Sequence, residues 1–290
     1  MDRREFLKKS TLAAAMAAVS MADRTGAAAA PDKGMPTIKL GGLEVSRLIL
    51  GSNPFWGVSH KSPALDEEMK RFYTDERITA VLEEAGACGI TAVVSPPEPR
   101  WLELWPKYLS KGGKLKLWIA QCHDGPDKIV AEIEQAGKGG AHAAFIQGGR
   151  ADEAFEKGNF DALRSWVEKI KSFGIPAGVA AHLPQVHPEL ERRKFPTDFY
   201  YQCFYTVSKG ATYRSEERAK AIETIRQIEK PVVAYKILAA GRLTAEEGFE
   251  FAFSHIRRKD GVCVGIFIRD GKDQIRQDAT LTESLSALQL

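Results

Sequence analysis

The chain has 290 residues, of which 44% are hydrophobic and 27% are charged, and its formal net charge is +3. Residues 1–30 carry five Lys or Arg and three Asp or Glu, so the remainder is nearly neutral. This balance gives no electrostatic reason to expect nucleic acid or an anionic membrane as a partner, and the length suits one domain with a sizeable core.

The first 30 residues resemble a twin-arginine signal peptide. The pattern is Arg3-Arg4-Glu5-Phe6-Leu7-Lys8, then a weakly apolar run over residues 11–22 and a small-residue stretch at 27–30 that suits cleavage. An apolar run of about 12 residues is too short to span a bilayer, and no other stretch approaches the required length. We therefore expect the twin-arginine export machinery as a partner, a periplasmic or otherwise exported protein, and a mature chain that is not embedded in a membrane.

The rest of the chain, after a linker at residues 31–36, is expected to form a single domain over residues 37–290. A Gly41-Gly42 pair between two short apolar runs predicts a β-hairpin. Eight short apolar segments follow, each succeeded by a helix-like stretch, with starts 23 to 43 residues apart: 47–51, 90–95, 115–122, 143–147, 176–182, 199–205, 232–237 and 262–268. This rhythm predicts a (β/α)8 TIM barrel in which the hairpin closes the barrel floor.

Helix signals and long connections accompany these strands. Asp75 is expected to cap one helix, and Thr244 with Glu247 forms a capping box for another. Residues 54–74 and 96–114 are interpreted as long loops after the first two strands, and both are rich in aromatic residues. Aromatic side chains on such loops suit the flat faces of sugars or other rings, or they pack as lids without touching a ligand.

Several segments resemble the aldo/keto reductases. Residues 40–54 resemble the hairpin and first strand of that family, residues 89–94 its second strand, residues 201–205 its sixth strand, and residues 231–243 its seventh strand and following loop. The resemblance implies a TIM barrel, and it implies that Gln202 and Tyr205 lie where that family contacts its nicotinamide cofactor.

The catalytic residues of that family are absent here. Its Asp position falls on Val94 or Ser95, its Lys position on Gln121 or Cys122, and its His position on Gln147 or Gly148. The loop after the second strand offers no equivalent of the family's proton-donating Tyr. Four replacements in one site are difficult to reconcile with the usual hydride transfer.

A different set of polar and aromatic residues follows the predicted strands. Because active sites of TIM barrels lie at the carboxyl ends of the strands, we expect these residues to converge on one pocket that binds a small molecule. The candidates for catalysis are Lys236, His123, His182, Tyr205 and Glu98. The candidates for substrate binding are Asn53, Gln121, Gln147, Gln202, Trp56 and Trp101.

The chemistry of this set leaves alternatives open. His123 and His182 could bind a divalent metal with an oxygen ligand from Glu98 or Asp124, or one of them could shuttle a proton. Lys236 lies in an apolar run, where burying a lysine that has no functional role is costly in free energy. It could be a general base, an electrostatic clamp or a Schiff-base nucleophile.

These residues support three hypotheses of function. The first is an exported enzyme that acts on a small carbonyl or sugar-type substrate by proton transfer, as an isomerase or lyase, with a divalent metal as the expected cofactor if there is one. The second is an NADPH-dependent oxidoreductase with an altered proton donor, either Tyr205 or His123. The third is a non-catalytic ligand-binding barrel, which scattered and solvated polar side chains would favour.

Overall fold

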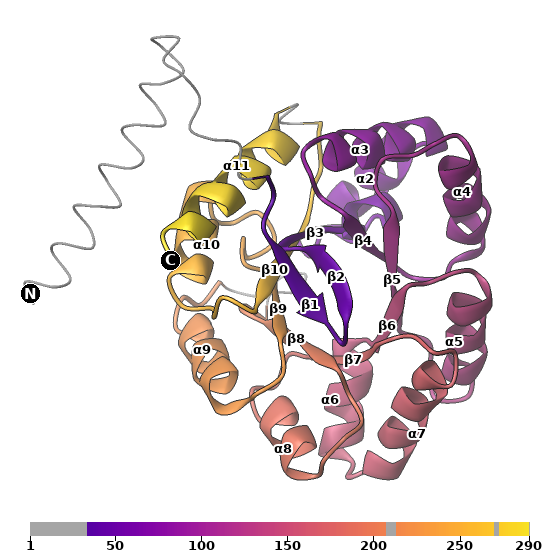
Figure 1. Ribbon diagram of the computed structural model, residues 1–290, viewed down its shortest axis with the longest axis vertical. Coiled ribbons are helices and arrows are strands. Elements are labelled where there is room, and N and C mark those ends of the chain that lie inside the picture. Colours follow the sequence, from indigo (N-terminus) through magenta and orange to yellow (C-terminus); the bar gives the residue numbers. More distant parts are fainter. Residues whose placement is uncertain (1–33, 207–212, 270–272, 290) are drawn as a thin grey trace, which may run out of the picture. The chain divides into compact units, whose positions relative to one another are not determined.

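The computed structural model describes residues 34–206, 213–269 and 273–289. The described barrel belongs to the compact unit Met35–Leu290 (Figure 1). The predicted signal segment, residues 1–30, and residues 31–33 of the predicted linker lie outside the described residues, so export stays a prediction.

Eight parallel strands close into a barrel in the order β10, β3, β4, β5, β6, β7, β8, β9. Their bounds are β3 (Leu48–Gly51), β4 (Ala92–Ser95), β5 (Leu117–Cys122), β6 (Ala143–Ile146), β7 (Ala177–Ala181), β8 (Phe199–Cys203), β9 (Val232–Tyr235) and β10 (Gly261–Gly265). Each strand lies within or beside the segment predicted for it, and the predicted TIM barrel is confirmed. Parallel strands need long crossover connections, which is why the wide spacing of the apolar segments carried the prediction.

The predicted hairpin closes one end of this barrel. Strands β1 (Thr37–Leu40) and β2 (Leu43–Ser46) pair antiparallel around Gly41 and Gly42, both of which have positive φ angles. Figure 1 shows this hairpin in front of the ring of strands. Its side chains Ile38, Leu40 and Val45 are buried in the same apolar cluster as the barrel interior. The hairpin therefore seals the floor, and ligands must enter from the other end.

The helices surround the barrel in Figure 1. Their bounds are η1 (Asn53–Trp56), α2 (Pro63–Phe72), α3 (Asp75–Ala87), α4 (Pro99–Ser110), α5 (Ile129–Lys138), α6 (Gly148–Glu156), α7 (Phe160–Lys171), α8 (Val186–Arg192), α9 (Glu217–Gln227), α10 (Ala245–Phe253) and α11 (Gln274–Ala287). The predicted capping box of Thr244 and Glu247 is present at the start of α10. Helix α3 is capped by Thr74, while Asp75 occupies its first turn.

The two segments interpreted as long loops are largely helical. Residues 96–114 contain α4, the crossover helix between β4 and β5, which begins at Pro99 and contains Pro106. Its buried residues Trp101, Leu104, Trp105 and Tyr108 have the spacing of one helical face. Proline in the first turn is compatible with a helix, so Pro99 marks a helix start here. Residues 54–74 likewise contain α2.

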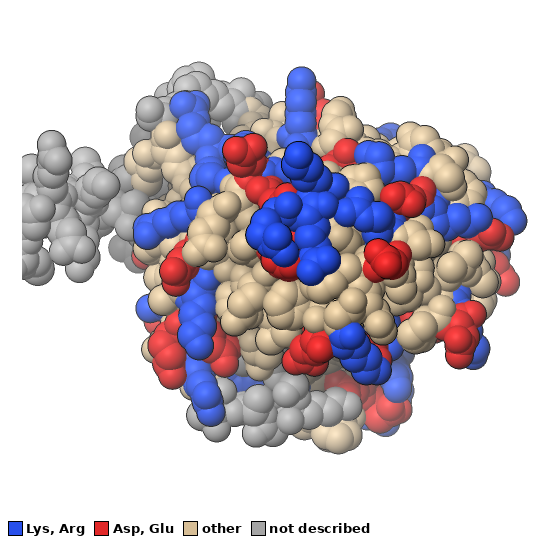
Figure 2. All heavy atoms as spheres, turned by 90° about the horizontal axis from the view of Figure 1, so that it is seen from below, with Lys and Arg blue, Asp and Glu red and all other residues tan. Residues whose placement is uncertain are grey.

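The surface carries charges of both signs. Figure 2 shows one cluster of positive side chains near the centre of the face seen from below, with acidic side chains around it. Within the described ranges, no helix combines the length and the apolar character needed to cross a membrane.

Candidate functional site

The open end of the barrel holds a cavity of about 840 Å³ at the carboxyl ends of the strands. This volume lies within the range of typical small-molecule sites, roughly 300–1,000 Å³. Eight of the predicted site residues line it: Asn53, Trp56, Glu98, Gln121, His123, Gln147, His182 and Lys236. They come from six different strands or the segments directly after them. The convergence expected from the barrel topology is therefore present for these residues.

His182 lies between an acid and an amine at the wall of this cavity. Its Nδ1 is 2.8 Å from Oδ2 of Asp152, and its Nε2 is 3.4 Å from Nζ of Lys236. Asp152, from α6, also accepts hydrogen bonds from the main-chain N–H groups of His182 and Leu183. The carboxylate is thus fixed by three donors, and it orients the imidazole so that Nε2 faces the lysine.

The backbone around Lys236 is strained. Lys236 has a φ of 56°, and Ala239 and Ala240 in the same connection have φ of 47° and 56°. His60, which also lines the cavity, has a φ of 55°. Left-handed conformations are unfavourable for residues other than glycine and accumulate at functional sites, where the surrounding structure enforces them. Among the described residues, Lys194 is the one further non-glycine residue with positive φ.

His60 is a neutral imidazole in this region. Burial, reinforced by the nearby charges of Lys236 and His182, lowers its pKa to about 4. Its Nε2 lies 3.4 Å from Nδ2 of Asn53. The ring can therefore accept or donate hydrogen bonds at neutral pH without adding a positive charge to the cavity.

His123 forms a second imidazole–carboxylate pair. Its Nδ1 is 2.9 Å from Oε1 of the buried Glu132, and its Nε2 is 3.9 Å from Oε1 of Glu98. Glu132, from α5, also accepts the main-chain N–H groups of His123 and Asp124. The hydrogen bond with Glu132 raises the pKa of His123. The pKa of His123 is therefore shifted in the opposite direction to that of His60.

The absence of a side chain at Gly148 leaves room for the imidazole of His182. A Cβ built on Gly148 would lie 2.9 Å from Cε1 and Nδ1 of His182 and 2.9 Å from the hydroxyl of Tyr235. That hydroxyl donates to the carbonyl of Ala181, the residue before His182. The start of α6 thus packs directly against the imidazole, and a larger side chain at residue 148 would displace it.

The rest of the cavity wall includes amide and aromatic groups. The Gln147 side chain accepts a hydrogen bond from Gly149 N–H and caps α6, while Trp56 donates its indole N–H to Ser52. Phe145 and Tyr201 stack with their ring centroids 4.4 Å apart at the bottom of the cavity. A ligand here would meet hydrogen-bonding groups on one side and flat apolar faces on another.

Three predicted site residues do not line the cavity. Gln202 is buried and donates to the carbonyl of Cys203, because Tyr201 takes the inward position on β8 and Gln202 points to the other side. Tyr205 is buried beside Tyr213 and Arg218. Trp101 is fully buried and stacks on Trp105 within the helix layer. The structure gives these three residues a packing environment away from the cavity.

The predicted metal site has no support from the side-chain arrangement. Residues 34–206, 213–269 and 273–289 contain no group of three or more His, Cys, Asp or Glu that could hold a metal ion. His182 is hydrogen-bonded to Asp152, and His123 forms an ion pair with Glu132, so each imidazole has a carboxylate of its own. Metal binding by these two residues stays a prediction.

Sequence reasoning missed four residues that shape the site: Asp152, Glu132, His60 and Tyr235. Asp152 and Glu132 lie on helices, where an acidic residue has no strand-end signal to distinguish it from the solvated face. Glu132 had one usable signal, since a charged residue on the buried face of α5, between Ile129 and Ile133, needs a partner.

Comparison with known proteins supports the fold. No family model and no curated protein matches the chain. Among solved structures, a proposed aldo-keto reductase from Pseudomonas aeruginosa has a TM-score of 0.60 at 16% identity, covering 88% of this chain and 99% of that one. The truncated 3-deoxy-D-arabino-heptulosonate 7-phosphate synthase from Thermotoga maritima has a TM-score of 0.52 at 12% identity, over 88% and 92% of the two chains.

A third similar structure is a proposed deoxyribose-phosphate aldolase from Coccidioides immitis, with a TM-score of 0.51 at 11% identity over 94% of this chain and 96% of that one. At these identities the similarity establishes a shared TIM-barrel fold. The fold hosts many unrelated chemistries, so function has to be argued from the cavity itself.

Proposed function

We propose that this chain is an exported enzyme that moves a proton at a carbon atom next to a carbonyl group, in a small polyhydroxylated substrate. The outcome of such a step is isomerisation or elimination. The observation that carries the proposal is the placement of His182 between Asp152 and Lys236 at the cavity wall, 2.8 Å and 3.4 Å away. An oriented imidazole beside an amine is a unit for taking and returning protons.

His182 and His123 suit opposite roles in the cavity. Nδ1 of His182 is hydrogen-bonded to Asp152, so Nε2 is the atom that accepts a proton. We assign the role of the acid towards a substrate oxygen to His123, whose pKa is raised by Glu132. Enolisation next to a carbonyl requires an acid and a base at one substrate, and both imidazoles line the same cavity.

The substrate class follows from the lining of the cavity. The amides of Asn53, Gln121 and Gln147 can donate to and accept from hydroxyl groups, and Trp56 offers an aromatic face. The similar structures described as an aldo-keto reductase and an aldolase carry names of carbonyl chemistry, which supports a carbonyl substrate by analogy of fold.

The alternative functions have less support from the cavity. The oxidoreductase hypothesis relied on Gln202 and Tyr205, which are buried elsewhere, although His123 would still be available as a proton donor. The binding-barrel hypothesis expected scattered, solvated polar groups, whereas His60 and His123 line one cavity and have pKa values shifted in opposite directions. A nicotinamide titration of the folded protein separates the first alternative from the proposal.

The export part of the proposal is supported by the sequence of residues 1–30. Replacement of both Arg3 and Arg4 by Lys should leave the protein in the cytoplasm with its signal segment uncleaved, because the arginine pair is the recognised element. Fractionation of cells producing the two forms measures this. Equal export of the double variant would overturn the assignment.

The catalytic part is tested by exchange of substrate protons in deuterated water. The protein is incubated with a panel of keto- and aldo-sugars, and NMR follows loss of the proton next to the carbonyl. We expect exchange with at least one compound, and its loss in Lys236→Met and His182→Asn. Lys169→Met, on α7 and paired with Glu134, is the control that should retain exchange. Unchanged exchange in both cavity variants would overturn the proposal.

A further inference from the structure

The amine of Lys236 has a proton acceptor built next to it. Nζ lies 3.4 Å from Nε2 of His182, and the opposite nitrogen of that ring is held by Asp152. A lysine that works only as a fixed positive charge needs no base beside it. A lysine that works as a nucleophile does, because its ammonium form must first lose a proton.

The surroundings of the amine favour the same role. Nζ lies 5.9 Å from the ring centre of Tyr235, and the lysine is held in a left-handed backbone conformation at the end of β9. His60, a neutral ring nearby, has its pKa lowered chiefly by burial and further by the charges of Lys236 and His182. The surroundings of Lys236 therefore present its amine to the cavity from a fixed position.

We propose that Lys236 forms a covalent imine with the carbonyl carbon of the substrate. The inference rests on the proposed function, since it requires a carbonyl compound in this cavity, and it restricts the substrate to an aldehyde or a ketone that carries a hydrogen on the adjacent carbon. Esters, amides and free carboxylic acids without such a carbonyl are excluded as reactants at Nζ.

The covalent step balances without an external reagent. His182 Nε2 takes one proton from the ammonium of Lys236, and the freed electron pair on Nζ forms a bond to the carbonyl carbon. The carbonyl π electrons move to oxygen, which gives a carbinolamine. Nζ passes a second proton to that oxygen, His182 returns the first proton to it, the carbon–oxygen bond breaks, and the oxygen leaves as water. A nitrogen–carbon double bond remains.

The imine explains the position of His182. Once Nζ is bonded to the former carbonyl carbon, the adjacent carbon lies two bonds away from Nζ, near the imidazole that has just become free. A protonated imine withdraws electrons and acidifies the hydrogen on that carbon, so His182 Nε2 can remove it. The same residue then serves imine formation and the proton transfer of the proposed function.

Reductive trapping tests the imine directly. The full chain is incubated separately with dihydroxyacetone, glycolaldehyde and pyruvate, and sodium borohydride is added to each sample. Reduction of an imine adds one probe molecule less one oxygen atom to the protein mass, and peptide mapping locates the modified lysine. We expect one adduct per chain at Lys236 with at least one probe, formed at least tenfold faster than on exposed lysines.

Three variants sharpen the test. Lys236→Arg keeps the positive charge but cannot form an imine, so the fast adduct should vanish. Lys61→Arg, at another lysine of the same cavity, should retain it. His182→Asn should slow it, because the proton acceptor is lost. The wild-type map of Lys236 against Lys61 gives the answer even where a variant fails to fold.

The failures of the two proposals are distinguishable. The imine proposal is overturned if no probe modifies Lys236 preferentially, or if the adduct is unchanged in Lys236→Arg. If Lys236→Met still loses proton exchange in that case, the proposed proton transfer stands without a covalent step. Proton exchange that survives unchanged in both Lys236→Met and His182→Asn overturns the proposed function itself.

Discussion

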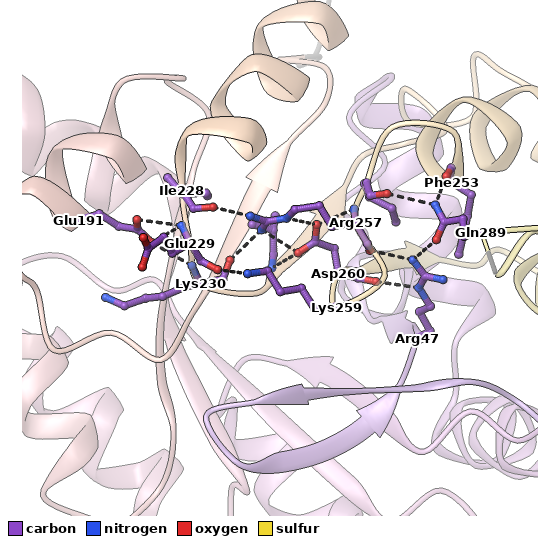
Figure 3. A network of polar contacts seen from close by, with 12 residues as sticks. Arg47, Glu191, Ile228, Glu229, Lys230, Phe253, Arg257, Lys259, Asp260 and Gln289 are labelled. Atoms are coloured by element: carbon purple, nitrogen blue, oxygen red, sulfur yellow. Dashed lines mark hydrogen bonds and ion pairs between the residues drawn. The ribbon is translucent and has the colours of Figure 1, made fainter. Parts of the chain in front are cut away.

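The two ends of the barrel both bury charged side chains, but they arrange them in opposite ways. At the floor, Asp260 is fully buried and accepts hydrogen bonds from Nε and Nη2 of Arg257 and from the main chain of Val232 (Figure 3). Arg47 donates to the carbonyls of Asp260 and Arg257. Burial lowers the pKa of Arg47 to about 10.

At the mouth, the carboxylate of each pair contacts Nδ1 of its imidazole and leaves Nε2 to other partners. Asp152 and Glu132 hold His182 and His123 by Nδ1, and both imidazoles line the cavity. The floor network connects the start of β3, the start of β9 and Gln289, and its acceptors are the Asp260 carboxylate, the Gln289 amide oxygen and main-chain carbonyls. Polar groups at the floor therefore close the barrel, whereas polar groups at the mouth present reactive atoms to a ligand.

The largest expected effect is at the mouth. Asp152→Asn keeps an oxygen for the main-chain N–H groups of His182 and Leu183 but removes the charge that orients the imidazole. We expect proton exchange to fall about 10³-fold, as with other imidazole-orienting carboxylates, with little change in melting temperature. The NMR exchange assay measures this. Asp161→Asn, on an exposed site in α7, is the matched control, and exchange within threefold of wild type in Asp152→Asn would contradict the account.

The next effect is at the floor. Arg257→Met leaves Asp260 buried without its ion pair, so we expect a loss of about 3 kcal/mol in the free energy of unfolding. Exchange per folded molecule should be unchanged. Denaturant unfolding provides the measurement, and the exposed neighbour Arg258→Met should stay within about 0.5 kcal/mol of wild type. A floor variant that loses activity while remaining stable would break the division between the two ends.

The carboxyl group of Asp278 belongs neither to the floor network nor to the imidazole–carboxylate pairs at the mouth. Among described residues, Asp278 on α11 is buried with no hydrogen-bond partner for either side-chain oxygen. Burial, with the nearby charge of Glu246, raises its pKa to about 8 from 3.8. The unfolded chain releases this proton near pH 4 and the folded chain near pH 8, so its contribution to stability falls as pH rises between these values.

Asp278→Asn should therefore stabilise the protein by about 2 kcal/mol at pH 8 and by much less at pH 4. Melting temperatures across this window measure the difference, with Asp273→Asn, outside the buried face of α11, as the control. A stability gain that is the same at both pH values would show that Asp278 is not held protonated.

The smallest effect concerns the position of the imidazole. Gly148→Ala places a methyl group 2.9 Å from the His182 ring, so the ring must shift. We expect exchange to fall about tenfold, which corresponds to about 1.4 kcal/mol in the activation free energy. Gly125→Ala, where a Cβ would meet nothing within 4 Å, is the control. Wild-type exchange in Gly148→Ala would remove the claim that His182 needs this placement.

The barrel could be predicted because its signal is long-range and repeated. Eight apolar segments with crossover spacing define the topology, and topology alone then brings Lys236 and His182 to one rim. The carboxylates behind them could not be predicted this way. Asp152 lies in a polar-looking helix start, and only the three-dimensional packing of α6 against β7 shows that it faces His182.

The residues misplaced from sequence have specific reasons. Gln202 could have been excluded by the alternation of side chains along β8, since Tyr201 occupies the inward position. Trp101 lies in a segment interpreted as an aromatic-rich loop, although the apolar spacing of α4 is helical. The resemblance to aldo/keto reductases favoured Tyr205, but its hydroxyl lies near Arg218 and not at the cavity.

The most direct test of the account is the proton position on His182, read by ¹⁵N NMR of histidine-labelled protein at a pH where the ring is neutral. His187 provides an internal reference, because its Nε2 lies 3.1 Å from the carbonyl of Tyr201 and must carry the proton there. The account predicts the opposite form for His182, with the proton on Nδ1 towards Asp152 and a bare Nε2 towards Lys236. A His182 protonated at Nε2 in its neutral state would contradict it.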